Sequence, residues 1–350
     1  MALISELPSI SVIIPTYNRS NYVIKTLESF INQNYPKDKY EIIVVDNNSS
    51  DNTAAIINDF IAKNKNNIKY ILETRRGNHH ARNNAASIAS NEILYFCDDD
   101  IIADRMLLKE IVRPFIIDQK VGTATGRVLP KWETPPPKWI ERYCNNRFLS
   151  LLDPPEDFLI SNNINFLFSC HQAIRKNVFI KAGGFNPETF GNKYLGDGET
   201  GLNIKISKLG YKFAFNGASV TYHAMSSNRY TQNYLNKRLE NAGYAKAYTD
   251  FRKNKHYSLL QFCFMTFEVS FIYMPLIFMA IFFNFIKYKD INVIRFIIAQ
   301  GYFYKSYLQY LSWLYFSSEW RKFALKSDWM GKEDDYRDII EKHLNLTNAN

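Results

Sequence analysis

The sequence predicts an α/β protein in which a mixed, mostly parallel sheet is flanked by helices and followed by a helical C-terminal region. Short apolar runs alternate with helical patterns over the first hundred residues. Such alternation is typical of βαβ units, which build parallel sheets. After about residue 230 the composition shifts, and long apolar segments rich in Phe and Tyr begin. We therefore expect an α/β domain first and a helical region after it.

The first half reads as four strands and three helices in alternation. The runs are continuous rather than alternating, as in IIVV at 42–45, which suits a sheet covered on both faces. The helix of the first βα unit carries Ile24, Leu27, Phe30 and Ile31 on one face. The predicted strands are Ile10–Ile14, Glu41–Val45, Ile68–Leu72 and Ile93–Cys97, and the other two helices are Asn52–Lys63 and His79–Ala89.

The second half contains three further apolar runs and one helix. Strands are predicted at Gly122–Leu129, Asn165–Ile174 and Lys212–Tyr222. The helix Leu202–Leu209 ends at Gly210, where glycine favours the left-handed conformation that closes a helix. Three consecutive prolines at 135–137 predict an irregular loop between Trp132 and Trp139. These tryptophans either stack on a sugar ring or anchor the loop.

Charge and cysteine content narrow the class of protein. The formal net charge is +9, which suits anionic partners such as nucleotides or an anionic membrane surface. No long Lys/Arg run or nucleic-acid-binding motif is present, so nucleic acid is not an expected partner. The four cysteines form no CxxC pair, which favours a reducing compartment without disulfides or a zinc site. The N-terminus lacks the features of a secretory signal.

The C-terminal region predicts membrane association. Residues 269–286 carry no charge, at the lower length limit for a transmembrane helix. Ile291–Phe316 is amphipathic, as in helices that lie in a membrane interface. Between 287 and 326 there are seven basic and two acidic residues, which favours binding to an anionic cytoplasmic leaflet. Two readings of 269–286 stay open, a span and a helix lying in the interface; the alternative to both is a buried helix.

Three polar clusters each directly follow a predicted strand. They are Pro15 to Asn18, Asp46 to Asp51 and Asp98 to Asp100. Because the C-terminal ends of parallel strands share one edge of the sheet, we expect these groups to converge on one ligand site. Adjacent carboxylates need a neutralising partner, and Mg²⁺ or Mn²⁺ prefers oxygen ligands shared with phosphates. An acidic turn or helix cap is the alternative interpretation of the triplet.

The ordered motifs resemble family-2 glycosyltransferases over about residues 8 to 225. The resemblance is carried by residues 11–53, by 75–100, which end on the DxD motif, by 168–188 and by 196–213. It implies a GT-A fold, a UDP- or dTDP-type donor and inversion at the anomeric carbon. It also implies a catalytic domain at 1–230, with a nucleotide-binding half (8–120) and an acceptor-binding half (121–230). Residues 231–350 form the helical region.

The resemblance assigns roles to single positions. It places Pro15, Thr16, Tyr17 and Asn18 at the donor nucleotide, and it places Asp46 at the edge of the nucleobase. Arg82 and, with less support, Arg75 and Arg76 would meet the nucleotide or its phosphates. Asp98 would contact the ribose and Asp100 the metal ion, while Asp99 holds the variable middle position.

Inversion also requires a general base that takes the proton of the acceptor hydroxyl. Counting back from Gly210 places Glu199 at the family's base position, with Asp197 as competitor. An acidic first helical turn is the structural alternative. His223, after the last strand, is a candidate third metal ligand. His171 either packs or contacts the acceptor, and His79 and His80 are expected to be loop residues.

Other classes fit the sequence less well. A sugar-nucleotide pyrophosphorylase would need an N-terminal glycine-rich loop, and residues 15–21 contain no glycine. A processive polysaccharide synthase would need several spans and a QxxRW-type segment, which is not evident. A non-catalytic membrane-bound nucleotide-sugar binder is the remaining alternative. The membrane prediction favours a glycan or lipid-linked glycan acceptor at the cytoplasmic face of the cell inner membrane.

Overall fold

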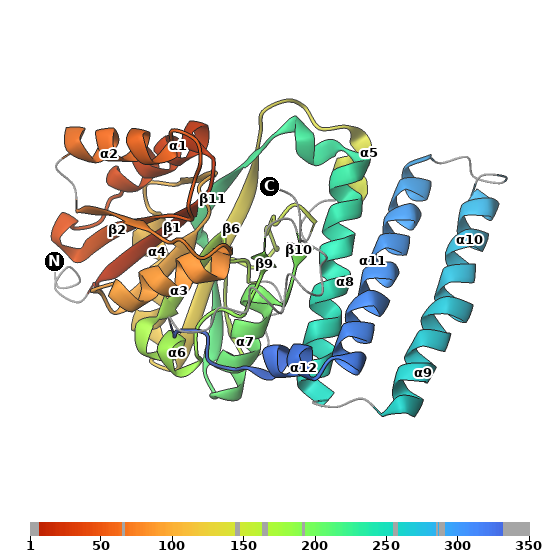
Figure 1. Ribbon diagram of the computed structural model, residues 1–350. Coiled ribbons are helices and arrows are strands. Elements are labelled where there is room, and N and C mark those ends of the chain that lie inside the picture. The colour runs from red at the N-terminus through yellow and green to blue at the C-terminus, as the bar shows by residue number, and fades with distance from the viewer. Residues whose placement is uncertain are drawn as a thin grey trace.

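One large sheet forms the centre of the α/β domain in the computed structural model (Figure 1). The structure describes residues 7–64, 67–143, 148–162, 167–190, 193–254, 258–284, 286 and 291–331. The strand order is β3-β2-β1-β4-β8-β6-β11-β5, and β7 pairs with β11 beside this path.

The first four strands of this order are parallel. They are β1 (Ile10–Thr16), β2 (Tyr40–Asp46), β3 (Ile68–Leu72) and β4 (Ile93–Cys97). The helices that connect them are α1 (Ser20–Ile31), α2 (Thr53–Lys63) and α3 (Asn78–Ile88). Strands β1, β2 and β4 are buried along their whole length, as their continuous apolar runs predicted.

The second half of the sheet mixes directions. Strand β8 (His171–Arg175) runs antiparallel to both β4 and β6 (Val121–Trp132), whereas β11 (Lys212–Met225) is parallel to β6. The C-terminal ends of β1, β2, β4, β6 and β11 therefore lie at one edge of the sheet. Strands β5 (Ile101–Ala103) and β7 (Phe158–Ser161) pair antiparallel with β11. The smaller elements are α4 (Leu107–Ile117), α5 (Lys138–Tyr143), α6 (Lys176–Lys181), α7 (Gly198–Lys208) and the hairpin β9 (Thr189–Phe190) with β10 (Lys193–Tyr194).

Two predicted elements have different bounds in the structure, and strand β5 was not expected. The strand expected over Asn165–Ile174 begins only at His171, and residues 163–166 lie outside the described part. Strand β5 was not predicted, because three residues carry too little pattern. Helix α7 begins at Gly198 rather than Leu202, so Glu199 lies in its first turn. Gly210 has φ of 81° after the helix, as the C-terminal signal predicted.

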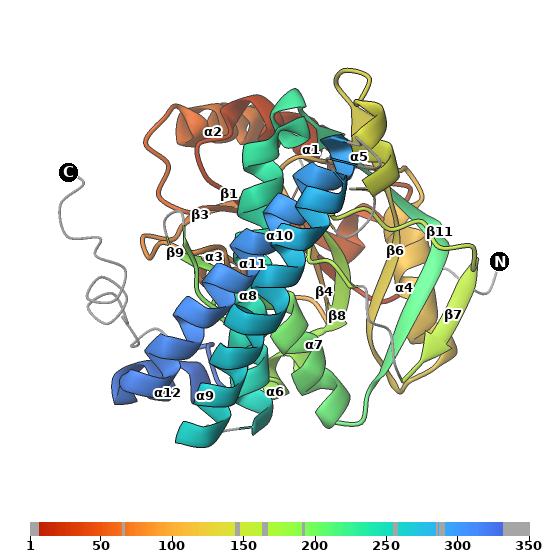
Figure 2. The same cartoon turned by 90° about the vertical axis from the view of Figure 1, so that its right-hand side faces the viewer.

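The C-terminal region consists of long helices stacked beside the catalytic domain (Figures 1 and 2). Helix α8 (Gln232–Asn254) lies against the domain, and α11 (Ile291–Phe316) lies on α8. A continuous helical stretch of α9 (Leu259–Phe267), the π-helical turn Glu268–Tyr273 and α10 (Met274–Phe283) packs on α11. Helix α12 (Ser318–Leu325) follows.

Among the described residues, one helix, Leu259–Phe283, is long and apolar enough to cross a membrane. It starts ten residues before the apolar segment predicted at 269–286, because uncharged residues and the capping box of Ser258 and Gln261 begin the helix earlier. Its outer face is exposed.

Candidate functional site

The acidic triplet lies between β4 and β5, at the edge where the strands end. Strand β4 ends at Cys97, and β5 begins at Ile101 and pairs with His223 of β11. The Ala224 amide donates to the Asp100 carbonyl (2.9 Å). This pairing brings the end of β11 beside the triplet, although about 120 residues separate them in the sequence.

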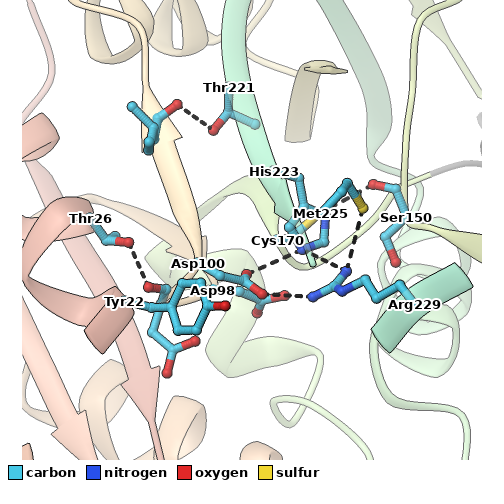
Figure 3. Close-up of polar contacts among 12 residues, drawn as sticks. Tyr22, Thr26, Asp98, Asp100, Ser150, Cys170, Thr221, His223, Met225 and Arg229 are labelled. Atoms are coloured by element: carbon cyan, nitrogen blue, oxygen red, sulfur yellow. Dashed lines mark hydrogen bonds and ion pairs between the residues drawn. The ribbon is translucent and has the colours of Figure 1, made fainter. Parts of the chain in front are cut away.

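Asp100 lies among three basic side chains, of which Figure 3 shows His223 and Arg229. Its Oδ2 accepts from Arg229 Nη2 and from Arg19 Nη1, both at 2.7 Å, and His223 Nε2 lies 3.1 Å from Oδ1. Burial by itself would raise the pKa of Asp100, but His223, Arg229 and Arg19 outweigh burial and lower it. The Asp100 carboxylate is therefore negatively charged at neutral pH.

Asp98, Asp100 and His223 form a set of potential metal ligands. Their ligand atoms lie within 4.8 Å of one another. Asp100 Oδ1 is buried and has no hydrogen-bond partner of good geometry among the described residues. Such an orphaned oxygen beside an imidazole nitrogen fits a divalent cation, since two carboxylates and one imidazole suit Mn²⁺ and also Mg²⁺.

Asp99 faces the interior. Its Oδ2 accepts from Thr16 Oγ1 (2.7 Å), its Oδ1 accepts from Arg19 (3.0 Å), and its carbonyl accepts from Thr26 Oγ1 (2.7 Å). Burial raises the pKa of Asp99 to about 7 against the opposing effect of Arg19. Asp99 thus ties the end of β4 to β1 and α1, and this contact holds Thr16 in the site.

Arg82 links the triplet to the second half of the domain. Its guanidinium is almost fully buried and pairs with Asp98 (2.8 Å) and with Glu188 (3.0 Å). A buried guanidinium needs charged partners, and these two carboxylates supply them. Asp98 is about one-third exposed, so part of its carboxylate stays open to a ligand.

Glu199 lies in the first turn of α7, close to this pair. Its Oε2 is buried without a hydrogen-bond partner among the described residues, although the residue as a whole is partly exposed. Burial and the neighbouring Glu188 raise the pKa of Glu199 to about 7, while Arg82 acts in the opposite direction. A carboxyl with a pKa near neutrality and a free oxygen has the properties of a general base.

Asp197 has a different environment. Its two carboxylate oxygens accept from Asn186 Nδ2 (2.7 Å) and from Thr249 Oγ1 of α8 (2.9 Å). It is buried, and burial raises its pKa. Gly201 lies so close to Asp197 and Asn186 that a Cβ would approach within 2.0 Å of each. Asp197 therefore connects α7, α8 and the loop before β9, and its role is structural.

We expect Asp197→Ala to lower the free energy of unfolding by about 1–3 kcal/mol, because the buried Asn186 amide loses its acceptor. Chemical denaturation measures this change. The control is Asp59→Ala, which breaks an exposed pair with Lys63 and should cost less than about 0.5 kcal/mol. Equal stability of the two variants would contradict the structural role.

The two N-terminal loops of the predicted donor site bind each other. Asn18, with φ of 51°, accepts on its side-chain oxygen from the amides of Ser50 (2.8 Å) and Asp51 (3.3 Å). Asp46 is buried and accepts from the Ser49 amide (2.8 Å) and Tyr70 hydroxyl (3.0 Å). Pro15 is buried at the end of β1, and Tyr17 is exposed beside these loops.

The remaining predicted residues lie in various places. His171 is a core residue: Tyr95 contacts its Nδ1 (2.6 Å), and burial lowers its pKa to about 4. His79, expected to be a loop residue, is instead buried in the first turn of α3 against Trp329. Arg76 is exposed before α3.

The two tryptophans have packing partners. Trp132 packs edge-on against Tyr230 (5.7 Å), and buried Trp139 lies under Arg295 of α11 (5.2 Å). Both contacts agree with anchoring of the proline loop. Arg75 pairs with Glu73 (2.8 Å).

Sequence reasoning missed Arg19, Glu188 and Arg229. Arg19 follows the first polar cluster directly, so its position was a usable signal. Glu188 lies in a loop and Arg229 in the short 3-10 helix Ser227–Tyr230, neither with a distinctive pattern, and only the fold brings Glu188 to Arg82 and Arg229 to Asp100.

Comparison with known proteins identifies the family of the chain. Residues 11–183 match the family model described as Glycosyl transferase family 2. The chain is similar to the probable glycosyltransferase YdaM of Bacillus subtilis, with 28% identity over 62% of this chain and 51% of that protein. It is also similar to the GalNAc(5)-diNAcBac-PP-undecaprenol beta-1,3-glucosyltransferase of Campylobacter jejuni, with 41% identity over 27% of this chain and 30% of that protein.

A solved structure supports the fold. The mannosyltransferase PcManGT of Pyrobaculum calidifontis, in complex with GDP-Man and Mn²⁺, superposes with a TM-score of 0.57 at 19% identity, covering 84% of this chain and 86% of that one. The chain belongs to glycosyltransferase family 2 and has the GT-A fold. It spans about half the length of YdaM and less of the Campylobacter protein.

Proposed function

We propose that this protein is a metal-dependent, inverting glycosyltransferase that moves a sugar from a UDP- or dTDP-type donor to an acceptor hydroxyl. The observation that carries the proposal is that a potential metal site and a candidate general base, both containing carboxylates, lie at one edge of the sheet. Asp98, Asp100 and His223 form a set of potential metal ligands, and Glu199 has a raised pKa and an Oε2 without a hydrogen-bond partner among the described residues. Transfer from a nucleoside diphosphate needs both.

Each group has a distinct task. Asp98, Asp100 and His223 would hold Mn²⁺ or Mg²⁺, which when bound offsets the negative charge of the leaving diphosphate. Arg19 and Arg229, both on Asp100, add positive charge at the same place. Thr16 is held there by Asp99, and Tyr17, Asn18 and Asp46 bind the nucleoside in this proposal, with Arg82 and exposed Arg76 toward the phosphates.

Glu199 is the general base of this proposal. The buried Oε2 takes the proton of the acceptor hydroxyl while that oxygen attacks the anomeric carbon and the diphosphate departs from the other face. Burial next to Glu188 keeps the pKa near neutrality, so the carboxylate is basic enough to accept the proton. One displacement of this kind inverts the anomeric configuration.

The rate of transfer should therefore depend on pH. Only deprotonated Glu199 is active, so kcat/KM should fall about tenfold per pH unit below a midpoint near 7 and level off above it. Initial rates of nucleoside diphosphate release at saturating metal, measured across this range, test the prediction. A rate that stays level down to pH 5 would exclude Glu199 as the titrating base.

A nucleotide-sugar consumption screen with Mn²⁺ and Mg²⁺ tests the proposal directly. Release of nucleoside diphosphate from a UDP- or dTDP-sugar supports it. Binding of a nucleotide sugar without turnover under any metal or acceptor would favour the non-catalytic binder. If no donor were bound or consumed, the proposal would fail.

We further propose that the acceptor is a glycan or lipid-linked glycan and that the protein attaches to the cytoplasmic face of the cell inner membrane. Helix Leu259–Phe283 is apolar, and only one of its residues, Val269, is buried, which water alone disfavours. The Campylobacter relative, whose name contains an undecaprenol-linked glycan, supports the acceptor class. Nucleic acid is not a partner in this proposal.

Charge placed on the apolar helix should release the protein from membranes. Phe271, 68% exposed, lies at the middle of this helix. We expect Phe271→Glu to weaken binding to vesicles by roughly tenfold or more, because the variant buries less apolar area and carries an added charge. Co-sedimentation with vesicles measures the change. The matched control Ile117→Glu, 56% exposed on α4, should bind as the parent protein does. Equal loss in both variants would contradict attachment through this helix.

A further inference from the structure

We propose that helix Leu259–Phe283 lies in the plane of the membrane surface, with its outer face in the acyl layer, and that it does not span the bilayer. This inference rests on the membrane attachment of the proposed function. The length of the helix would permit a span. The inference follows instead from how the helix is fixed to the rest of the protein. The helix has 25 residues and is about 38 Å long, against a hydrocarbon core of about 30 Å.

The helix is fixed to α11 along its length. Phe262 stacks on Tyr315 with ring centroids 4.5 Å apart, and Tyr273 stacks on Tyr304 at 4.9 Å. The two pairs are eleven residues apart on both helices, so the helices run antiparallel and side by side. The orientation of one sets that of the other.

Helix α11 is fixed to α8 by hydrogen bonds along its length. Gln232 donates to the Arg295 carbonyl (3.0 Å) near the start of both helices, and Tyr244 donates to Gln309 (2.8 Å) further along. Between these contacts, Ser306 donates to the Glu240 carbonyl (2.7 Å). Gly243 packs so closely that a Cβ would meet Ser306 Oγ at 2.1 Å. Such close contact leaves no room for α8 and α11 to rotate relative to each other.

Helix α8 is in turn fixed to the α/β domain. Thr249 donates to Asp197 beside the site, and α8 stands between the sheet and α11 (Figure 1). The axes of α8, α11 and helix 259–283 therefore have the same orientation, whichever way each chain runs. A span by the outer helix would place the other two across the bilayer as well.

That arrangement is incompatible with the charges. Tyr304 faces the middle of helix 259–283, so exposed Lys305 would lie at the bilayer centre. Helix α8 would bring seven charged side chains to membrane depth: Lys237, Arg238, Glu240, Lys246, Asp250, Arg252 and Lys253. Charged groups at that depth are costly. A flat orientation leaves all of them in water or among the headgroups.

The exposed face of the helix fits the flat orientation. Residues along its whole length are apolar and open, including Leu260 at 82% exposure, and polar Thr266 and Ser270 are less exposed. The most exposed large side chains are Leu259, Leu260, Phe264, Phe271, Phe278, Phe282 and Phe283. Interfacial helices bury such a face by about 5–10 Å. Neighbouring helix axes lie about 8–10 Å apart, so α8 stays clear of the acyl layer.

Charge favours a lipid surface over a second copy of the chain as the occupant of this face. The sequence segment 287–326, which follows the helix, has seven basic and two acidic residues. Like charges of two copies would repel each other, whereas anionic headgroups would attract them. In the flat orientation α11 and helix 259–283 lie between α8 and the lipid.

Depth-dependent fluorescence quenching tests the orientation. A fluorophore is attached to Leu260→Cys, Phe271→Cys or Phe282→Cys in full-length protein that carries Cys144→Ser and Cys263→Ser, since Cys97 and Cys170 are buried. The protein is reconstituted from detergent into phosphatidylcholine–phosphatidylglycerol vesicles. The lipids carry a nitroxide near the headgroup or near the chain end. Ile117→Cys on α4 is the control and should not be quenched.

We expect the shallow nitroxide to quench all three helix labels more strongly than the deep one. Stronger deep quenching at Phe271, with shallow quenching at both ends, would show a span and overturn the inference. Absence of quenching at all three would show that the face meets another partner and would also overturn it. Donor turnover is measured in the same vesicles, so shallow quenching without turnover supports the orientation while the proposed transfer fails.

Discussion

Replacing Glu199 by glutamine is expected to lower kcat by about 10²–10⁴-fold, because an amide cannot take the acceptor proton. The change keeps the shape of the side chain, so the Kd of the nucleotide sugar should stay within a few-fold of the parent value. Nucleoside diphosphate release measures kcat, and calorimetry measures binding. The pH dependence below neutrality should disappear in the variant, since it arises from Glu199.

Asp197→Asn is the matched control, because the sequence left both acidic residues as candidate bases. Asparagine can still accept from Asn186 and contact Thr249, so transfer should be largely retained with at most a lower Tm. The opposite pattern, with a larger loss of kcat for Asp197→Asn at unchanged Tm, would move the base to Asp197.

Replacing Asp100 by asparagine is expected to reduce transfer by about 10²–10³-fold and to weaken Mn²⁺ binding. The removed carboxylate is one of the three potential ligands, and a bound metal contributes several kcal/mol to stabilising the leaving group. Electron paramagnetic resonance of free Mn²⁺ measures binding without any turnover. The variant also frees Arg19 and Arg229 from their shared partner, so its Tm must be compared with that of the parent.

Asp59→Asn is the control for loss of a negative charge. Asp59 is exposed on α2 and pairs only weakly with Lys63, since exposed ion pairs contribute little. Its Mn²⁺ affinity and its rate should equal those of the parent. Unchanged Mn²⁺ binding in Asp100→Asn would rule out the proposed metal site.

Local pattern was enough to predict the nucleotide-binding half of the fold. Strands β1, β2 and β4 are nearly continuous apolar runs between helical patterns, and burial on both faces of a parallel sheet produces that signal directly. Two features were less predictable. Strand β5 has only three residues, and the sequence does not show that β8 runs antiparallel to β4 and β6.

The sequence by itself determined the fold family, the acidic triplet and Glu199 as a candidate base, because these depend on residues close together in the chain. Only the tertiary structure showed that Asp197 is held by hydrogen bonds to Asn186 and Thr249, whereas Oε2 of Glu199 has no hydrogen-bond partner among the described residues. Only it brought Arg19 and Arg229 to the triplet and Glu188 to Arg82, since contacts between residues far apart in the chain leave no local pattern. It also set the apolar helix alongside charged α8, and the membrane orientation that we propose follows from this packing rather than from hydrophobicity.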